Sequence, residues 1–357
     1  MTATVVHVLG TLDRGGAESV ALDLCRRIPA AEIRQVFLTL GTREGRLAPR
    51  FREAGAVVDR CPVRPLALFV PLLWRRLGSV RPDVVVSHVS LVSGLVLAVA
   101  GAAGVPVRIA RLHSEGDGRP ATARRRLQRA VLRAALRRSA TAVLGVTSAA
   151  LAFAGPADGD RRYRVVPNGV DTDRFTVTDR PSGAPVFVHI GRAAPEKNRG
   201  FLLQIHAEAR QLCAETTLVV AGPGGIADLE AAMPTVAADP SVCLVGETDQ
   251  VEEVLASGDV LLLPSYREGL PGVVLEALAA GVPVLASDLP GLRELAGQLA
   301  GITLIPLAAG PLAWARTALR LAATPMAQRR EISAGIRGSG FALERCVATW
   351  SQLWTSR

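Results

Sequence analysis

The sequence predicts an α/β protein made of two doubly wound domains, each built around a parallel sheet. Short apolar runs of strand length alternate with amphipathic helical segments through both halves of the 357 residues, and this alternation is typical of βαβ units. A segment rich in Pro, Gly and Ser, residues 179–185, lies between the halves and is typical of a linker. We therefore expect an N-terminal domain over residues 1–180, a C-terminal domain over 181–340 and a final helix within 341–357.

The composition fits a globular enzyme with two cores. Apolar residues make up 49% of the chain, which is too many for a disordered protein. The five cysteines are scattered and contain no Cys-x-x-Cys pair, which favours reduced thiols in the cytosol over disulfides or a zinc site. The chain starts directly with a strand-like run, so we expect no targeting segment and a cytoplasmic location. The longest apolar stretch, 91–107, is interrupted by glycines and Pro106 and predicts a buried helix and the start of a strand.

The chain is strongly basic, with a formal net charge of +9 that comes almost entirely from arginine. Lys197 is the single lysine among 41 basic residues. Such a charge suits an anionic ligand, an anionic membrane surface or nucleic acid. The sequence contains none of the common nucleic-acid-binding modules, and aromatic residues make up only 4% of it. We therefore expect no nucleic-acid partner.

In the N-terminal half, the first strand leads into a glycine-bearing loop and a helix over residues 17–28. Further strands are expected over 35–40, 57–60, 84–88, 107–112 and 142–146. Ligands of such sheets bind at the carboxyl ends of the strands. Gly15 and Gly16 follow the first strand, where paired glycines let the backbone approach a ligand closely. The alternative is an ordinary turn between strand and helix.

His113 is a second candidate, because it directly follows the strand over 107–112 and opens a polar loop with Ser114 and Gly116. A histidine at a strand end lies on the ligand side of the sheet. The alternative is a histidine that only supports the structure.

Residues 119–138 form an arginine-rich helix with apolar residues at helical spacing. Its basic residues are Arg119, Arg124, Arg125, Arg126, Arg129, Arg133, Arg137 and Arg138, and its apolar ones include Leu127, Val131, Leu132 and Leu136. A basic amphipathic helix can lie on an anionic bilayer, which predicts a peripheral membrane contact. The alternative is a helix with one face in the core and a solvated arginine face.

The C-terminal half repeats the strand–loop–helix rhythm, with a strand over 186–190 and a helix over 199–212. The loop between them holds Arg192 and Lys197 at the end of the strand. Arg192 can donate to two phosphate oxygens at once, and Lys197 supplies a compact charge. The alternative is an exposed charge pair between Glu196 and Lys197.

A strand over 260–263 is followed by a glycine-rich loop and a helix that starts at Gly272. The first amides of a helix bind anions such as phosphate. Because Pro271 has no N–H, the donors here are Leu270, Gly272 and Val273. Two carboxylates accompany this anion site: Glu268 in the loop and Glu276 in the helix. A carboxylate accepts from hydroxyl groups, so the loop suits a ligand with both phosphate and hydroxyls, a nucleotide-sugar. The alternative is a surface helix with two solvated glutamates.

The run from Glu268 to Glu276 resembles the E-x7-E motif of retaining glycosyltransferases of family 4, which have the GT-B fold. The segments 167–175 (PNGVDTDRF) and 191–198 (GRAAPEKN) resemble two further motifs of that family. The resemblance implies two Rossmann-like domains that face each other across a cleft, with the final helix, 341–353, crossing back to the N-terminal domain. It also implies that the N-terminal domain binds the acceptor and the C-terminal domain binds the donor.

The resemblance further implies a role for each candidate residue. Glu268 and His113 would contact the donor sugar, Glu276 the nucleotide ribose, and the loop of Gly15 and Gly16 would face the donor. Arg192 and Lys197 would neutralise the leaving diphosphate, so no metal or other cofactor is expected. The implied reaction transfers a sugar with retention of configuration from a nucleotide-diphosphate sugar, UDP-linked rather than GDP-linked, to an acceptor hydroxyl. The acceptor would belong to polysaccharide or glycolipid assembly, or to an antibiotic or other secondary metabolite.

Two other functions fit the same residues. One is an enzyme of this fold that epimerises or hydrolyses a nucleotide-sugar without a separate acceptor. The other is a non-catalytic nucleotide-sugar-binding subunit. The sequence leaves the base, the donor sugar, the acceptor and the oligomeric state open.

Overall fold

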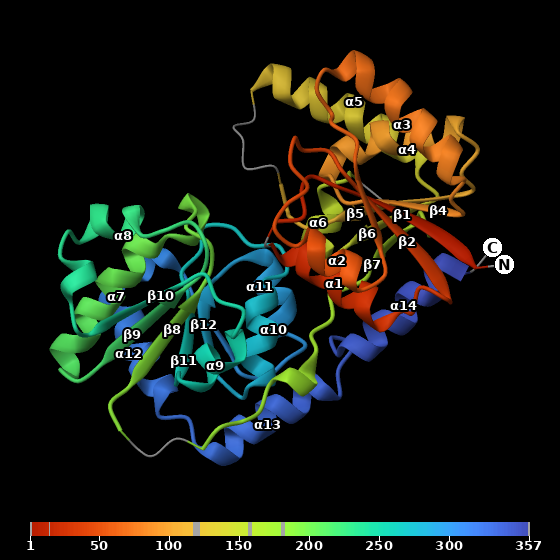
Figure 1. The fold of residues 1–357 in the computed structure, drawn as a ribbon. Coiled ribbons are helices and arrows are strands. Elements are labelled where there is room, and N and C mark those ends of the chain that lie inside the picture. The colour runs from red at the N-terminus through yellow and green to blue at the C-terminus, as the bar shows by residue number, and fades with distance from the viewer. Residues whose placement is uncertain (1, 14, 117–121, 156–158, 180–182, 356–357) are drawn as a thin grey trace. The chain divides into compact units, whose positions relative to one another are not determined.

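The chain forms two compact units (Figure 1). The computed structural model describes residues 2–13, 15–116, 122–155, 159–179 and 183–355. One unit comprises Met1–Gly169 with Leu343–Arg357, and the other comprises Val170–Ala342. The division therefore falls after Gly169, earlier in the chain than the boundary at 180 that we expected; residues 180–182 lie outside the described part.

Hydrogen bonds explain why the segment after Gly169 belongs to the second unit. The Val170 N–H donates to the Phe341 carbonyl oxygen at 2.8 Å. The Arg337 guanidinium donates to the carbonyl oxygens of Thr172 and Phe175, both at 2.7 Å. These contacts attach residues 170–175 to the end of the C-terminal unit, so the division between the units lies before them.

The N-terminal unit contains a seven-stranded sheet in which all neighbouring strands are parallel. The strand order is β3-β2-β1-β4-β5-β6-β7, with β1 Ala3–Leu9, β2 Ile33–Thr39, β3 Val57–Arg60, β4 Val84–Ser87, β5 Val107–Leu112, β6 Ala142–Gly145 and β7 Tyr163–Val165. The six strands expected from the sequence are confirmed, with small shifts at their ends, whereas β7 was not predicted.

Helices cover both faces of this sheet (Figure 1). One face carries α1 (Gly16–Arg27), α2 (Ala48–Glu53) and α14 (Leu343–Thr355), and the other carries α3 (Leu66–Val80), α4 (Ser93–Ala102) and α5 (Ala123–Ser139); the short α6 (Ser148–Ala152) follows β6. Alternate residues of a strand point to opposite faces. Val6 accordingly packs in the same core as Phe69 of α3, while Val5 packs in the core that holds Trp350 of α14.

The C-terminal unit contains a six-stranded parallel sheet with the order β10-β9-β8-β11-β12-β13. Its strands are β8 Val186–Ile190, β9 Thr217–Ala221, β10 Val242–Gly246, β11 Val260–Leu263, β12 Val284–Ser287 and β13 Ile302–Ile305. Its helices are α7 Arg199–Leu212, α8 Ala227–Ala232, α9 Val251–Ala256, α10 Gly272–Ala279, α11 Pro290–Ala296, α12 Pro311–Ala322 and α13 Met326–Arg337. The core on one face joins α7 and α12 to the sheet through buried residues such as Leu202 and Trp314.

Both sheets reverse their strand order at one point. In the N-terminal unit this point lies between β1 and β4, and in the C-terminal unit between β8 and β11. At such a point the loops after the two strands diverge to opposite sides of the sheet, which leaves a crevice at the carboxyl ends where ligands bind. The fold therefore marks the loops after β1, β4, β8 and β11 as the places to look for a site.

The described part of the expected basic helix is α5, and Arg119 lies outside the described residues. The apolar side chains of α5 do not form a single stripe that faces the core. Leu136 is buried and Leu132 packs against the core, but Leu127 and Val131 are 68% and 60% exposed. The stretch 91–107 forms α4 and the start of β5 as predicted, and no helix in the described ranges has the length and apolarity to cross a bilayer.

The last helix is held on the N-terminal unit at the Asn-Gly segment. The indoles of Trp350 and Trp354 are buried in a core of this unit. A Cβ atom on Gly169 would lie 2.7 Å from Cys346 Cβ and 2.9 Å from Leu343 Cα, so a glycine is needed for the helix to approach this closely. The final helix begins at Leu343, slightly later than predicted.

Gly169→Ala should therefore destabilise the N-terminal unit by about 1–3 kcal/mol, because the added methyl group pushes α14 away from the sheet. The measurement is urea unfolding followed by tryptophan fluorescence. Gly78→Ala in α3 is the matched control, since a Cβ there meets no atom within 4 Å and alanine favours a helix. Equal stability of the Gly169→Ala variant and the unaltered protein would contradict this explanation.

Candidate active site

The loops after β8 and β11 meet at the switch point of the C-terminal unit. The first contains a short 3-10 helix, η3 (Pro195–Lys197), and ends at Asn198, whose φ of 53° is left-handed. Asparagine tolerates this conformation better than most residues, and it turns the chain into α7. The second loop, residues 264–271, leads into α10. The Tyr266 N–H donates to the Glu196 carbonyl oxygen at 2.8 Å, so the two loops are joined by a hydrogen bond.

These loops bring Lys197 and Glu268 together. Lys197 Nζ lies 2.7 Å from Glu268 Oε1, and the same oxygen accepts a hydrogen bond of 2.6 Å from Ser265 Oγ. The lysine and glutamate side chains are only 15% and 9% exposed. Charges so far removed from water require a partner. Two residues predicted from separate motifs therefore form one buried ion pair.

Arg192 is not part of this pair. Its guanidinium forms an ion pair with Glu196, and 60% of its side chain is exposed. The alternative of a charge pair between Glu196 and Lys197 is wrong, because each of them pairs with a different residue. An exposed ion pair contributes only about 0–1 kcal/mol, so Arg192 can leave Glu196 for an anionic ligand at little cost.

The first turn of α10 follows Glu268 closely in the sequence. Gly272 and Val273 occupy its first two positions, where backbone amides have no acceptor within the helix. Leu270 precedes the helix with a buried side chain, and Glu276 lies one turn into it. The structure thus places the predicted amide donors at a helix N-terminus, where the helix dipole favours an anion.

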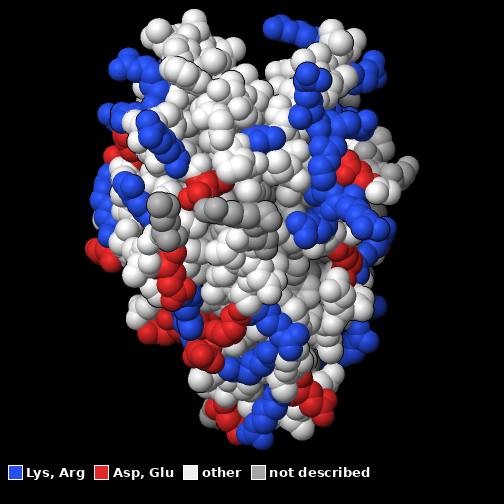
Figure 2. All heavy atoms as spheres, turned by 90° about the vertical axis from the view of Figure 1, so that its right-hand side faces the viewer, with Lys and Arg blue, Asp and Glu red and all other residues white. Residues whose placement is uncertain are grey.

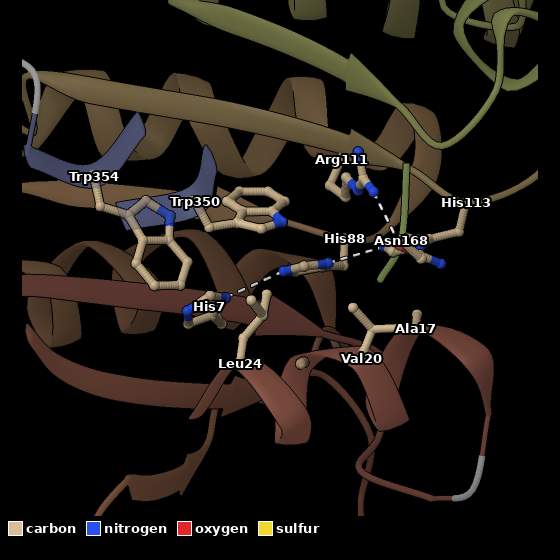
Figure 3. A pocket seen from close by; sticks show the side chains of 11 residues that line it. His7, Ala17, Val20, Leu24, His88, Arg111, His113, Asn168, Trp350 and Trp354 are labelled. Atoms are coloured by element: carbon tan, nitrogen blue, oxygen red, sulfur yellow. Dashed lines mark hydrogen bonds between the residues drawn. The ribbon is translucent and has the colours of Figure 1, made fainter. Parts of the chain in front are cut away.

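The glycine loop of the N-terminal unit leads into α1. Gly15 is the residue that caps the helix, and its carbonyl oxygen accepts from the Ser19 N–H at 2.9 Å. A Cβ on Gly15 would collide with the carboxylate of Glu18, whereas a Cβ on Gly16 would meet no atom within 4 Å. Ala17, the next residue, lines a small cavity together with His113 (Figure 3). The first turn of α1, which follows the glycine loop, and His113 therefore border the same cavity.

His113 is the outer member of a chain of three histidines (Figure 3). His113 Nε2 lies 2.9 Å from His88 Nδ1, and His88 Nε2 lies 3.2 Å from His7 Nδ1. His88 directly follows β4 and His7 lies in β1, so the chain crosses the switch point of the sheet. The same cavity is lined by His7, Ala17, Val20, Ala21, Leu24, His88, Arg111, His113, Asn168, Trp350 and Trp354.

The three imidazoles are neutral at physiological pH. Burial lowers the pKa of His7 to about 3, and burial together with the charge of Arg111 lowers the pKa of His113 to about 3. Burial also holds the pKa of His88 well below its usual value, with smaller contributions from its two histidine neighbours and Arg111. These rings can therefore exchange hydrogen bonds but carry no charge.

Arg111 is the buried cation of this site. Its guanidinium donates to Asn168 Oδ1 at 2.9 Å and lies 5.4 Å from the centre of the Trp350 ring. Burial lowers its pKa to about 10, which still leaves it charged at neutral pH. The Asn-Gly segment thus does more than make a turn: Asn168 holds Arg111, and Gly169 admits the final helix.

No group of three His, Cys, Asp or Glu side chains within the described ranges is arranged to hold a metal ion. The largely buried charged groups at the two switch points are the Lys197–Glu268 pair in the C-terminal unit and Arg111 in the N-terminal unit.

Comparison with known proteins assigns the chain to a family. A model of the "Glycosyl transferase 4-like domain" matches residues 15–169, and one of "Glycosyl transferases group 1" matches residues 184–324. Together they account for most of both units. The chain is a glycosyltransferase of the family that these two models describe, and it has the GT-B fold.

Relatives of this glycosyltransferase occur in several bacteria. EpsF of Bacillus subtilis (strain 168), named as a glycosyltransferase, is 28% identical over 96% of this chain and 94% of its own. The 2-deoxystreptamine glucosyltransferase of Streptomyces kanamyceticus is 34% identical over 58% of this chain and 57% of its own. The Anabaena protein Alr3699/HepE in complex with UDP and glucose superimposes with a TM-score of 0.80 over 99% of both chains, at 16% identity. That likeness confirms the fold of the glycosyltransferase.

His7, His88 and Arg111 were not predicted as site residues. His88 carries a usable signal, since it directly follows the strand β4, just as His113 directly follows β5. His7 and Arg111 lie inside strands and carry none. Arg199 was also not predicted: it is buried and forms an ion pair with Asp228, which ties the start of α7 to α8.

The buried histidines should make the glycosyltransferase less stable in mild acid. Their pKa values lie below the ordinary value of about 6.5, so between pH 6.5 and 4 the unfolded chain binds protons that the folded chain does not. Stability is then fully present above pH 7 and falls as the pH decreases, by about 1.4 kcal/mol per pH unit for each such histidine. Urea unfolding at pH 7.5, 6.0 and 5.0 measures this loss. A free energy of unfolding that stays constant from pH 7.5 to 5.0 would show that the imidazoles are accessible.

Proposed function

We propose that this chain is a retaining glycosyltransferase that moves a sugar from a nucleotide-diphosphate sugar, UDP-linked in preference to GDP-linked, to an acceptor hydroxyl. The observation that carries the proposal is the ion pair between Lys197 and Glu268. It places a cation and a hydrogen-bond acceptor side by side at the switch point of the C-terminal sheet, next in the chain to the first turn of α10. A ligand that combines a diphosphate with sugar hydroxyls matches this combination.

In this proposal the diphosphate binds to Lys197, Arg192 and the amides of Leu270, Gly272 and Val273. An ammonium has three N–H donors, so Lys197 can keep its bond to Glu268 while it donates to a phosphate oxygen. Glu268 accepts from hydroxyls of the donor sugar, and Glu276 accepts from the ribose.

The proposed chemistry takes place on one face of the sugar. The bond between the anomeric carbon and the diphosphate oxygen breaks, and the acceptor oxygen forms a bond on the same face. The acceptor's proton goes to the departing phosphate oxygen. The negative charge that develops on the diphosphate is stabilised by fixed donors, which is electrostatic preorganisation. We propose that these cations and amides suffice without a metal ion.

The names of relatives support a carbohydrate or small-molecule acceptor. They include the 2-deoxystreptamine glucosyltransferase, a capsular polysaccharide biosynthesis glycosyltransferase of Staphylococcus aureus, and an Escherichia coli galactosyltransferase named for UDP-Gal and a diphosphoundecaprenol-linked acceptor. UDP in the HepE complexes supports the choice of base. We propose an acceptor from polysaccharide, lipid-linked or secondary-metabolite synthesis.

The function is tested first by binding and then by transfer. Calorimetric titration with UDP- and GDP-sugars should give binding of UDP-sugars and weaker binding of GDP-sugars. With the matching donor and added acceptors, NMR should show a product that keeps the anomeric configuration of the donor, with EDTA present. Product formed from the donor alone would indicate an epimerase or hydrolase instead, and donor binding without any reaction would indicate a non-catalytic subunit.

Lys197→Gln and Glu268→Gln should each lower kcat/KM by about 100-fold, because each removes a group that acts on the donor. Each also leaves a buried partner charge, which costs about 3–5 kcal/mol of stability. The double variant removes both charges, so it should recover stability without recovering transfer. Arg210→Gln, which alters an exposed ion pair of α7, is the control. Transfer by the double variant within a fewfold of the unaltered protein would refute the assignment.

We also propose that the N-terminal unit docks on an anionic membrane through α3 and α5. Both helices pack against α4 on one face of the sheet, and neither contains Asp or Glu. Their exposed apolar side chains are Leu66, Leu68, Val70, Trp74, Leu127 and Val131, and their exposed arginines include Arg75, Arg124, Arg126 and Arg138. Basic and uncharged side chains predominate at the top of the view in Figure 2, the level of α3 and α5 in Figure 1.

Exposed apolar side chains and exposed arginines on the same helices suit the surface of an anionic bilayer better than bulk water. Each basic residue near an anionic surface contributes about 1 kcal/mol, tryptophan prefers the interface, and inserted apolar area contributes about 25 cal/mol per Å². The outward position of Leu127 and Val131 argues against the alternative of a helix with one face in the core and a solvated arginine face.

The protein should therefore sediment with vesicles that contain phosphatidylglycerol and not with pure phosphatidylcholine, and salt should weaken the binding. Trp74→Ser and Leu127→Ser should each reduce the bound fraction, because each removes an inserted side chain. Leu212→Ser, at an exposed leucine of α7, is the matched control. Absence of binding to anionic vesicles at low salt, or an equal loss in the control, would contradict docking through α3 and α5.

A further inference from the structure

The histidine chain of the N-terminal unit has two ends. At the outer end, His113 Nδ1 is buried and has no hydrogen-bond partner among the described residues; at the inner end, the same holds for His7 Nε2. The inner ring cannot turn freely, because it stacks on Phe37 at 4.6 Å between centroids and meets the edge of Trp354 at 5.3 Å. The hydrogen-bonding state of one end is therefore transmitted to the other.

In a hydrogen-bonded chain of neutral imidazoles, the ring protons can be arranged in only two ways. Each neutral ring has one N–H donor and one bare nitrogen acceptor. If His113 donates through Nε2, then His88 must donate through Nε2 as well, and His7 then carries its proton on Nε2. If the direction is reversed, every ring carries its proton on Nδ1. The group that His7 Nε2 faces thus decides which nitrogen of His113 is bare.

Gln35 faces the inner end. It lies on β2, opposite Val5 in the strand register, and its amide interacts with the His7 ring and raises the pKa of His7 against the stronger effect of burial. Gln35 Oε1 is buried and, like His7 Nε2, has no hydrogen-bond partner in the described part of the chain. Unpartnered buried polar atoms cost about 1–3 kcal/mol each. One bond from a His7 Nε2–H to Gln35 Oε1 would satisfy both atoms.

We propose that Gln35 and the two inner histidines are positioning residues that hold His113 in the tautomer with its proton on Nε2. His113 Nε2 is occupied by His88, so a ligand can reach the ring only at Nδ1, which this tautomer leaves as a bare acceptor. The ligand group at His113 is then an O–H or N–H donor, such as a sugar hydroxyl. A carboxylate or phosphate oxygen is excluded there, because it only accepts. The consequence for the ligand rests on the proposed function, whereas the tautomer does not.

NMR of the full chain with ¹⁵N-labelled histidine tests the tautomer without any substrate. In the unaltered protein His113 should show an unprotonated Nδ1 and a protonated Nε2. Gln35→Met removes the terminal acceptor at similar volume, and His7→Phe removes the last link while keeping a ring against Phe37. Both variants should give His113 as a mixture of tautomers. Thr39→Val, another buried polar position on β2, should leave it unchanged. A proton on His113 Nδ1 in the unaltered protein, or an unchanged tautomer in both variants, would overturn the proposal.

A binding measurement separates this proposal from the proposed function. Gln35→Met should weaken the affinity for the UDP-sugar about threefold to tenfold, the value of one hydrogen bond, and leave the affinity for UDP unchanged. A shifted tautomer with unchanged affinity for the UDP-sugar would uphold the histidine chain and remove His113 from the donor site.

Discussion

The ion pair between Lys197 and Glu268 is the interaction on which the candidate site of the C-terminal unit depends. It joins the loops after β8 and β11 at the switch point of the sheet, and Ser265 adds a hydrogen bond to the same carboxylate oxygen. Because both side chains are largely buried, each charge compensates the other. The sheet thus holds a cation and an acceptor in place before any ligand arrives, which is the condition for electrostatic preorganisation.

The N-terminal unit uses the same position in its sheet with different electrostatics. Its switch point is crossed by uncharged imidazoles, and the nearby cation, Arg111, is buried behind them against Asn168 and Trp350. Burial and this cation keep the histidines neutral. The switch point of the C-terminal unit therefore offers charge, and that of the N-terminal unit offers hydrogen bonding by uncharged groups.

The sequence was sufficient for the fold and for the positions of the candidate residues along the chain. The strands β8 and β11 and the helix α7 could be predicted, because apolar periodicity and glycine breaks are local signals. The pairing of Lys197 with Glu268, 71 residues apart, could not, because it depends on which strands become neighbours. The contact of His7 with His88 and the packing of α14 against Gly169 could not be predicted for the same reason. The outward position of Leu127 was hidden because helical spacing does not tell which side of an apolar pattern meets the core.

The most direct measurement is a crystal structure of the chain with an intact UDP-sugar. We expect diphosphate oxygens within about 3 Å of Lys197 Nζ and of the first amides of α10, with a sugar hydroxyl hydrogen-bonded to Glu268. A donor bound elsewhere, with no contact to Lys197 or Glu268, would show that this ion pair is not the donor site.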